Sequence, residues 1–329
     1  MRLSEVIWKC RKGIREVDIL LSRYTEKFYP HLSEEDKKIY VEFIDQDTYA
    51  ILDVLVNDKK PENEKFIKIV EALKSFNKYH YTMRSNRIRL GVNLDHIAFI
   101  KKSRDTLYPS LADAVKITED AGADLITIHL REDRRHIQDS DAFEVRDCAK
   151  TLNFEMANTM EMIEFALKLK PDFCCIVPEK REEKTTEGGL NLKKLNVSEL
   201  DLFKNNIKKL AEAGIKTSLF IDPDIESVKL SKELGAEIVE LHTGHYANKF
   251  NSIDEFEALD SLSMASNTAH DLGLIVNAGH GLNIENLTQI CEIPHIHELN
   301  IGHSIISQAV FVGLKDAIEK IISIIDNCD

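Results

Sequence analysis

LITIHLREDRRHIQD (Leu125–Asp139) joins an apolar run directly to a densely charged segment. The run Leu125–Ile128 is rich in β-branched residues and is typical of a buried strand. From His129 to Asp139 the chain then places three arginines, three acids and two histidines within eleven residues. Such a segment at the end of a buried strand is either an ordinary solvated loop or part of an active site.

The same pattern, a short apolar run followed by polar residues, recurs along the chain after residue 87. The candidate strands are Ile88–Asn93, Leu125–His129, Leu152–Met156, Phe173–Val177, Lys216–Ile221, Ile238–Leu241, Leu274–Asn277 and His297–Ile301. Successive strands leave room for one helix, for example Leu111–Ala121, Val197–Ala213 and Ser252–Leu272. Strands that are apolar throughout are typical of a parallel sheet buried on both faces. Eight such units over about 240 residues predict a (β/α)8 TIM barrel, with an open doubly wound sheet as the alternative.

The N-terminal part of the chain has a helical period instead. The apolar residues that fall on one helical face include Val17, Leu20, Leu21, Tyr24 and Phe28. Ser33 suits an N-cap, and Pro61 suits the start of the last helix. We therefore expect an α/β protein in three parts: a small all-α helical bundle at 1–82, a linker at 83–87 and the TIM barrel at 88–329.

Composition excludes several classes of protein. The 329 residues carry a formal net charge of −13, which argues against general nucleic-acid binding, because that binding relies on Lys and Arg contacts to phosphates. No stretch approaches the roughly 20 apolar residues that membrane insertion requires. The N-terminus also lacks the apolar core of a signal peptide, so we expect a cytoplasmic protein.

A TIM barrel carries its active site at the C-terminal ends of its strands. Here the candidate strands end in or next to Asn93, Asp95, His96, His129, Arg131, Glu155, Glu179, Lys180, Asp222, Glu240, His242, Asn277, His280, Gly281, Asn300, Gly302 and His303. Glu155 lies among apolar residues, where desolvation would raise its pKa toward the range of a general base. His129 and His280 are of a type that exchanges protons near neutral pH.

Two glycine-histidine pairs predict a site for a phosphorylated substrate. Gly279-His280-Gly281 and Gly302-His303-Ser304 each follow a late strand, and each is expected to open a helix. Glycine lets the backbone approach a ligand closely, and the free N–H groups of a helix N-terminus favour an anion.

Other chemistries have less support in the sequence. No H-x-x-x-H or H-E-x-x-H pair is present, so we expect no catalytic metal. Lys180 is the only lysine this close to a strand end, which leaves a Schiff-base aldolase open. The long polar segment Glu179–Gly189 predicts either a mobile lid or a plain flexible loop.

Eight longer motifs lie in order between about Arg89 and Lys320. They are GVNLDHIA, GADLITIHLREDRRHIQD, NFEMA, FCCIVPEKREEKTTEGGLN, SLFIDPD, EIVELHTGHYA, VNAGHGLN and HELNIGHSII. Together they resemble the pyridoxine 5′-phosphate synthase family. The resemblance implies a TIM barrel that condenses 3-amino-2-oxopropyl phosphate with 1-deoxy-D-xylulose 5-phosphate to pyridoxine 5′-phosphate, phosphate and water. It also implies no metal or organic cofactor, and a homo-octamer built from dimers.

The resemblance further implies roles for single residues. His129 and Glu155 match the family's proton acceptors, and His280 matches its proton donor. The residues that match contacts to the deoxyxylulose phosphate are Asp95, His96, Arg131, His136 and Thr185. Those that match contacts to the amino-oxopropyl phosphate are Asn93, Arg104, Gly281, Gly302 and His303. Beside Arg104 the sequence departs from the family pattern, because Asp105 replaces a glycine and adds a negative charge.

The stretch IWKCRKGIREVDILLSRYTEKFYPHLSEEDKKIYVEFIDQDTYAILDVLV, Ile7–Val56, resembles a second family. It is similar to SdhE, the small helical factor that assists covalent FAD attachment to succinate dehydrogenase. This resemblance implies a flavoprotein partner for residues 1–82. The hallmark R-G-x-x-E of that family reads Lys12-Gly13-Ile14-Arg15-Glu16 here, and lysine cannot form the planar bidentate fork of arginine.

Two other functions stay open at this point. The barrel could be a different enzyme of phosphosugars, an aldolase or an isomerase. Alternatively, the chain could be chiefly an assembly factor with a passenger barrel. The polar groups at every candidate strand end favour an active barrel over a passenger.

Overall fold

The computed structural model describes residues 3–57, 59–80, 87–104, 106–179, 188–252 and 254–328. The chain divides into two compact units, 1–82 and 83–329, and each unit has its own hydrophobic core. Asp105, Lys180 and Thr185 lie outside the described residues, as do most of the expected linker at 83–87 and most of the expected lid. In the described part of the chain, none of the helices combines the length and apolarity needed to cross a bilayer.

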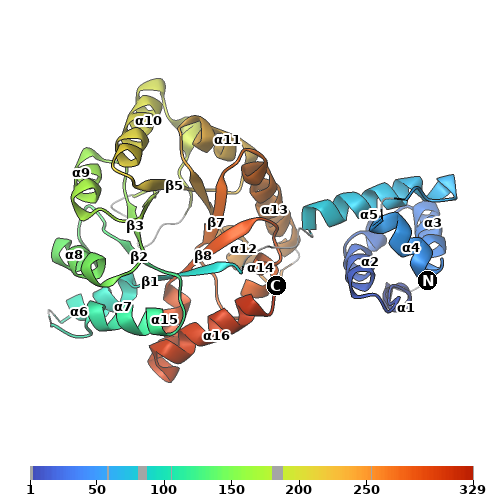
Figure 1. Ribbon diagram of the computed structural model, residues 1–329, viewed down its shortest axis with the longest axis horizontal. Helices are drawn as coiled ribbons and strands as arrows, with labels where there is room; N and C mark the ends of the chain where they lie inside the picture. Colours follow the sequence, from blue (N-terminus) through green and yellow to red (C-terminus); the bar gives the residue numbers. More distant parts are fainter. Residues whose placement is uncertain are drawn as a thin grey trace. The chain divides into compact units, whose positions relative to one another are not determined.

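Eight parallel strands close into a barrel in the second unit, and β8 pairs with β1 to complete the ring. The strands are β1 (Arg89–Asn93), β2 (Leu125–His129), β3 (Leu152–Met156), β4 (Phe173–Ile176), β5 (Lys216–Ile221), β6 (Ile238–His242), β7 (Ile275–Gly279) and β8 (Ile296–Ile301). Figure 1 shows these strands at the centre of the unit, with the helices around them. The TIM barrel is therefore confirmed, and the open sheet is excluded.

Helices follow the strands around the outside of the barrel. They are α6 (Asp95–Lys102), α7 (Leu111–Asp120), α8 (Asp139–Cys148), α9 (Met160–Leu169), α10 (Val197–Glu212), α11 (Ile225–Glu233), α12 (Gly244–Lys249), α13 (Glu255–Asp271), α14 (Leu287–Cys291), α15 (His303–Val312) and α16 (Leu314–Asp326). The segment expected as one helix over Ser252–Leu272 forms α13 alone, and α12 precedes it. Most other predicted ends coincide with the observed ones, and the rest differ by one or two residues, as helix and strand ends commonly do.

The interior of the barrel is polar. Thr127 Oγ1 donates to Asn300 Oδ1 at 2.9 Å, Asn300 Nδ2 donates to Glu240 Oε2 at 2.9 Å, and Asn277 Nδ2 donates to Glu298 Oε1 at 2.9 Å. The first two bonds skip the strand that lies between their partners, so these side chains must point into the barrel. The expectation of strands that are apolar throughout is therefore wrong at these positions. The apolar core instead combines outward-facing strand residues with the helices.

The first unit is a small all-α bundle, as predicted. Its elements are α1 (Leu3–Lys9), α2 (Arg15–Phe28), α3 (Glu34–Ile44), α4 (Thr48–Leu55) and α5 (Ile67–His80), with short 3₁₀ turns at Tyr29–His31 and Glu64–Phe66. Ser33 caps α3 by accepting a hydrogen bond from the Asp36 backbone N–H at 3.1 Å. The expectation for Pro61 is wrong, because α5 begins six residues later, after the second 3₁₀ turn.

Candidate active site

Side chains at the ends of the first four strands converge on His129. Its Nε2 lies 2.9 Å from Glu179 Oε1, and its Nδ1 lies 3.8 Å from Glu155 Oε2. The strand register explains the second contact, because His129 and Glu155 are paired residues of β2 and β3 and share one face. The backbone N–H of His129 also donates to Asp95 Oδ1 at 2.8 Å. A buried imidazole thus lies among three carboxyl groups.

The carboxyl groups around His129 differ in proton affinity. Burial raises the pKa of Asp95 to about 6, although His129 partly opposes this shift. Burial, together with nearby Glu240 and Asp95, raises the pKa of Glu155 well above its ordinary value. Burial acts in the same sense on Glu179, but hydrogen bonds from His129 and the Glu132 backbone outweigh it and lower the pKa. Glu179 is therefore ionised beside Glu155, whose pKa is raised, so a base and a potential acid lie close together, as acid–base catalysis requires.

Glu240 lies inside the barrel below this rim, where its Oε2 accepts hydrogen bonds from Asn300 Nδ2 and Cys175 Sγ. Burial, followed by repulsion from Glu298, raises the pKa of Glu240 to about 8. Glu179 and Glu240 were named as polar strand-end residues but were not among the candidate site residues. The available signal was their position, after β4 for Glu179 and within β6 for Glu240. This signal was not sufficient, because the sequence does not say which strand-end groups point inward.

The last two strands bring a second group of candidates together. His303 Nδ1 lies 3.3 Å from His96 Nε2, so the end of β8 meets the start of α6. Gly302 is the N-cap of α15, and a Cβ at this position would lie 2.9 Å from Asn93 Cβ. Asn93 in turn accepts a hydrogen bond from the Asp95 backbone N–H at 2.9 Å. Asn93, Asp95, His96, Gly302 and His303 therefore form one continuous part of the rim.

His280 and Gly281 follow β7 in an unusual backbone conformation. Both have positive φ angles, 81° and 76°, which costs energy for a residue with a side chain. Burial, followed by the charge of His242, lowers the pKa of His280 to about 4. The expectation that this Gly-His pair opens a helix is wrong, because α14 begins only at Leu287. The expectation is correct for Gly302-His303, which begins α15.

The remaining candidates have different surroundings. Arg131 is buried, with 4% of its surface exposed. The His136 ring packs against Phe99 at 5.4 Å, and burial, followed by nearby Arg135, lowers its pKa to about 4. Arg104 is exposed, and no hydrogen bond to another described residue holds its side chain. Thr185 lies outside the described residues.

The charged loop that follows β2 is tied down by ion pairs. Arg134 contacts Asp139 at 2.9 Å and Glu161 at 2.6 Å, and Arg135 contacts Asp133 at 2.6 Å. These ion pairs hold the loop to itself and to the first turns of α8 and α9.

Asp95, His129 and Glu155 also place one ligand atom each within 4.8 Å of one another, a spacing that a metal ion could use. A metal would have to compete with a proton on Glu155, whose pKa is raised well above its ordinary value. Acid–base catalysis, in contrast, uses the same three side chains without a metal ion.

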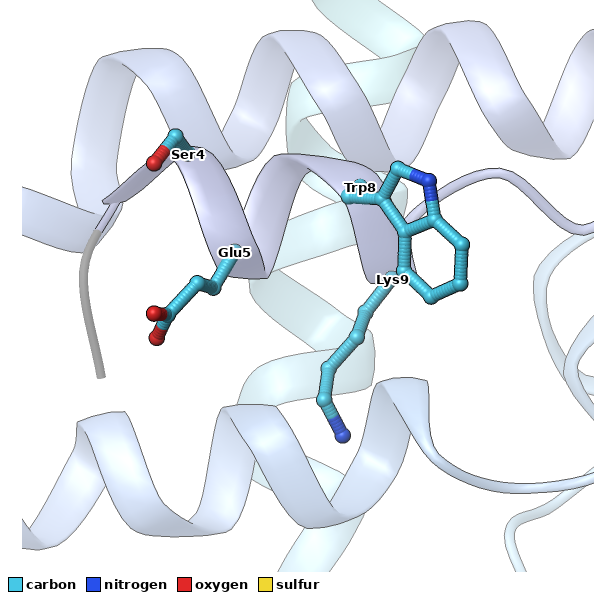
Figure 2. A pocket seen from close by; sticks show the side chains of 4 residues that line it. All are labelled: Ser4, Glu5, Trp8 and Lys9. Atoms are coloured by element: carbon cyan, nitrogen blue, oxygen red, sulfur yellow. The ribbon is translucent and has the colours of Figure 1, made fainter.

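The helical unit presents a separate surface on α1. Ser4, Glu5, Trp8 and Lys9 line a pocket of about 440 Å³, and Figure 2 shows how these four side chains lie. Trp8 is 76% exposed, whereas Lys9 is held by Asp45 at 2.6 Å. An exposed indole of this size is unusual for a surface that contacts only water.

A second local feature of this unit is the turn at Gly13. Gly13 has a φ of 81°, which favours glycine. The backbone N–H groups of Lys12 and Gly13 both donate to the carboxylate of Asp18. Asp18 therefore fixes the turn that joins α1 to α2.

This chain has ionisable groups gathered at the C-terminal rim of an eight-stranded barrel. That combination of fold and site is typical of (β/α)8-barrel enzymes. Residues 90–327 match the family model described as pyridoxal phosphate biosynthesis protein PdxJ, and residues 4–77 match the model described as flavinator of succinate dehydrogenase. Pyridoxine 5′-phosphate synthases of Neisseria meningitidis serogroups A and C are each 50% identical over 232 residues, which is 70% of this chain and 94% of theirs. The chain belongs to the PdxJ family and carries an additional SdhE-like unit.

Proposed function

We propose that the barrel condenses 3-amino-2-oxopropyl phosphate with 1-deoxy-D-xylulose 5-phosphate to form pyridoxine 5′-phosphate, phosphate and water. The observation that carries this proposal is the buried His129, held by Glu179 at 2.9 Å and flanked by Glu155 and Asp95. A ring-closing condensation needs several proton transfers, and this group offers both acids and bases. The name of the curated relatives, pyridoxine 5′-phosphate synthase, agrees with this reaction.

In the proposed mechanism, the substrate amine attacks the pentulose ketone, and water leaves to give an imine. Further proton transfers eliminate phosphate, and an aldol-type closure followed by water loss completes the pyridine ring. His129 and Glu155 accept protons in these steps, and His280 donates one. A cationic amine or iminium near Glu155 would lower its pKa and let it act as a base near neutral pH.

The two phosphates are proposed to bind at different parts of the rim. Asn93, Arg104, Gly281, Gly302 and His303 would contact the amino-oxopropyl phosphate. Asp95, His96, Arg131, His136 and Thr185 would contact the deoxyxylulose phosphate. A dianionic phosphate beside His280 would raise the pKa of this imidazole above the value of about 4 that burial and His242 produce. Substrate binding would then charge the proton donor.

Incubation of the purified full chain with both substrates and a chelator tests the proposal. We expect pyridoxine 5′-phosphate and phosphate to form in equal amounts, and no product under these conditions would refute it. The aldolase alternative predicts an adduct trapped by borohydride that a Lys180→Ala variant loses. The PdxJ family assignment favours the synthase over the aldolase, the isomerase and the passenger barrel.

Gly302→Ala is expected to raise the KM for 3-amino-2-oxopropyl phosphate about tenfold, with a much smaller change in kcat. The added Cβ would lie 2.9 Å from Asn93 Cβ and 3.3 Å from the Asn93 carbonyl oxygen. Asn93 or the start of α15 must therefore move away from the proposed phosphate site. Steady-state kinetics with each substrate in turn provide the measurement. An equal rise for the two substrates would argue against the assignment of this subsite.

For residues 1–82 we propose a role in binding a flavoprotein subunit, with the barrel at 88–329 acting as the synthase. The support is the family match over 4–77 and the exposed Trp8 on α1. The cytoplasmic location and the octamer stay predictions, which cell fractionation and light scattering can test.

Trp8 is the only tryptophan of the chain, so its fluorescence reports on the helical unit alone. We expect the emission of Trp8 to shift to shorter wavelength on addition of a succinate dehydrogenase flavoprotein subunit, because the indole would leave water. Trp8→Ala should weaken this binding at least tenfold, as truncation of a central aromatic anchor commonly does. Unchanged affinity of Trp8→Ala in calorimetry would place the contact elsewhere on the unit.

A further inference from the structure

Two residues outside the proposed catalytic set lead to His280: His242 lies beside it, and Asp222 contacts His242. The Nδ1 atom of His242, at the end of β6, lies 3.1 Å from Asp222 Oδ1, just after β5. The rings of His242 and His280 have their centroids 5.0 Å apart. Asp222, His242 and His280 therefore form a row across three neighbouring strand ends.

The position of His242 is closely fixed. Its ring packs against Phe220, with the centroids 5.3 Å apart. A Cβ at Gly244 would lie 2.4 Å from His242 Nε2 and 3.1 Å from His280 Cδ2, so only glycine leaves room for both rings. Asp222 is fixed as well, because its Oδ1 also accepts a hydrogen bond from the Gly189 backbone N–H at 2.9 Å.

The Nε2 atom of His242 is buried and has no hydrogen-bond partner among the described residues. Only 6% of the residue is exposed. His242, His280, Asp222 and Gly281 line one cavity of about 860 Å³. A buried imidazole nitrogen without a partner at a cavity wall is costly unless a ligand, a water or a proton uses it.

The charge of Asp222 determines which nitrogen of His242 can exchange a proton. The hydrogen bond from His242 is the main reason that the pKa of Asp222 lies below its ordinary value. An ionised Asp222 requires Nδ1 of His242 to carry hydrogen, which leaves Nε2 as the atom that gains or loses a proton. Asp222 is half-exposed, so water screens part of this interaction.

Resting on the function proposed above, we propose that Asp222 and His242 form a carboxylate–imidazole pair that positions His280 and supplies its proton. In the substrate-free site, burial and the charge of His242 keep His280 neutral. When an anionic substrate binds, the proton leaves His242 Nε2 and reaches an imidazole nitrogen of His280, directly or through one water. His242 is then neutral, with Nδ1–H still donated to Asp222, and solvent in the cavity returns the proton.

Other charged groups near this row are few among the described residues. Asp224 and His245 also line the cavity. Lys193 Nζ pairs with Asp224 Oδ2 at 3.2 Å and contributes to the lowered pKa of Asp222. Burial and the charge of His242 together account for the low pKa of His280.

The test combines an NMR titration of His280 with kinetics. In His242→Gln, loss of the neighbouring positive charge should raise the titration midpoint of His280 by roughly one pH unit. Asp222→Asn should raise it in the same direction, because His242 then loses the anion that stabilises its charge. For both variants kcat should fall, about 100-fold for His242→Gln, while both KM values stay within about threefold. The control is His270→Gln, an exposed histidine on α13, which should behave as wild type.

A His280 midpoint that is unchanged in both variants would overturn the proposal, even if kcat falls. If His242→Gln does not fold, the half-exposed Asp222→Asn still decides the question. The titration needs no turnover, so it also separates this inference from the proposed function. A shifted midpoint in a protein that makes no pyridoxine 5′-phosphate would refute the proposed function alone.

Discussion

Glu155→Gln is expected to lower kcat for pyridoxine 5′-phosphate formation by about 1000-fold while the protein stays folded. Positioned general acids and bases contribute about 10²–10⁴-fold to rates, and an amide can neither accept nor release the proton. Glu155 faces His129 at 3.8 Å on the paired strand, so it lies at the centre of the proposed proton transfers. Turnover is measured with both substrates at saturation.

The substitution should cost little stability, because burial favours the neutral form of the carboxyl that it replaces. Burial and the nearby Glu240 and Asp95 raise the pKa of Glu155 well above its ordinary value, and glutamine has nearly the same shape as the neutral carboxyl. We therefore expect Tm within about 3 °C of wild type. Glu233→Gln, at an exposed position of α11, is the matched control. Turnover of Glu155→Gln within threefold of the control would remove Glu155 from the mechanism.

The barrel could be predicted from the sequence because its strands and helices alternate eight times. Buried parallel strands need apolar outward-facing side chains, and this requirement leaves a clear pattern. The polar interior was missed for a physical reason. Thr127, Glu240, Asn277 and Asn300 lie within otherwise apolar strands, and their cost of burial is offset by hydrogen bonds to partners distant in sequence.

The residues at the rim of the site were also predicted only in part. Strand ends of a barrel meet at one face, so the sequence could bring His129, Glu155 and Asp95 together in advance. It could not show that Glu179 turns back onto His129 at 2.9 Å, because that contact depends on the loop conformation. Nor could it show the positive φ of His280, which replaces the helix start expected there.

The free energy of unfolding of the barrel is expected to fall as pH rises from 6.5 to 8. Burial raises the pKa of Glu240 to about 8 and that of Glu298 to about 7, whereas both return to roughly 4.3 in the unfolded chain. Between these values the folded state holds protons that the unfolded state has released, so higher pH favours unfolding. This stability is fully present below about pH 4 and is lost as pH rises through the folded-state pKa.

Glu240 alone should account for about 2 kcal/mol of this loss between pH 6.5 and 8, and Glu155 adds to it in the same direction. The pH range of this prediction starts at 6.5 because two histidines act in the opposite sense at lower pH. The pKa values of His136 and His280 lie at about 4 in the folded protein, so these residues destabilise the folded state only below the ordinary histidine pKa. Urea unfolding of the barrel, followed by circular dichroism, gives the measurement, while Trp8 fluorescence follows the helical unit separately. In Glu240→Gln the pH dependence should shrink by about 2 kcal/mol, because the amide keeps an acceptor for Asn300 but cannot ionise. An undiminished pH dependence in this variant, with Glu233→Gln as control, would show that Glu240 is already ionised in the folded protein.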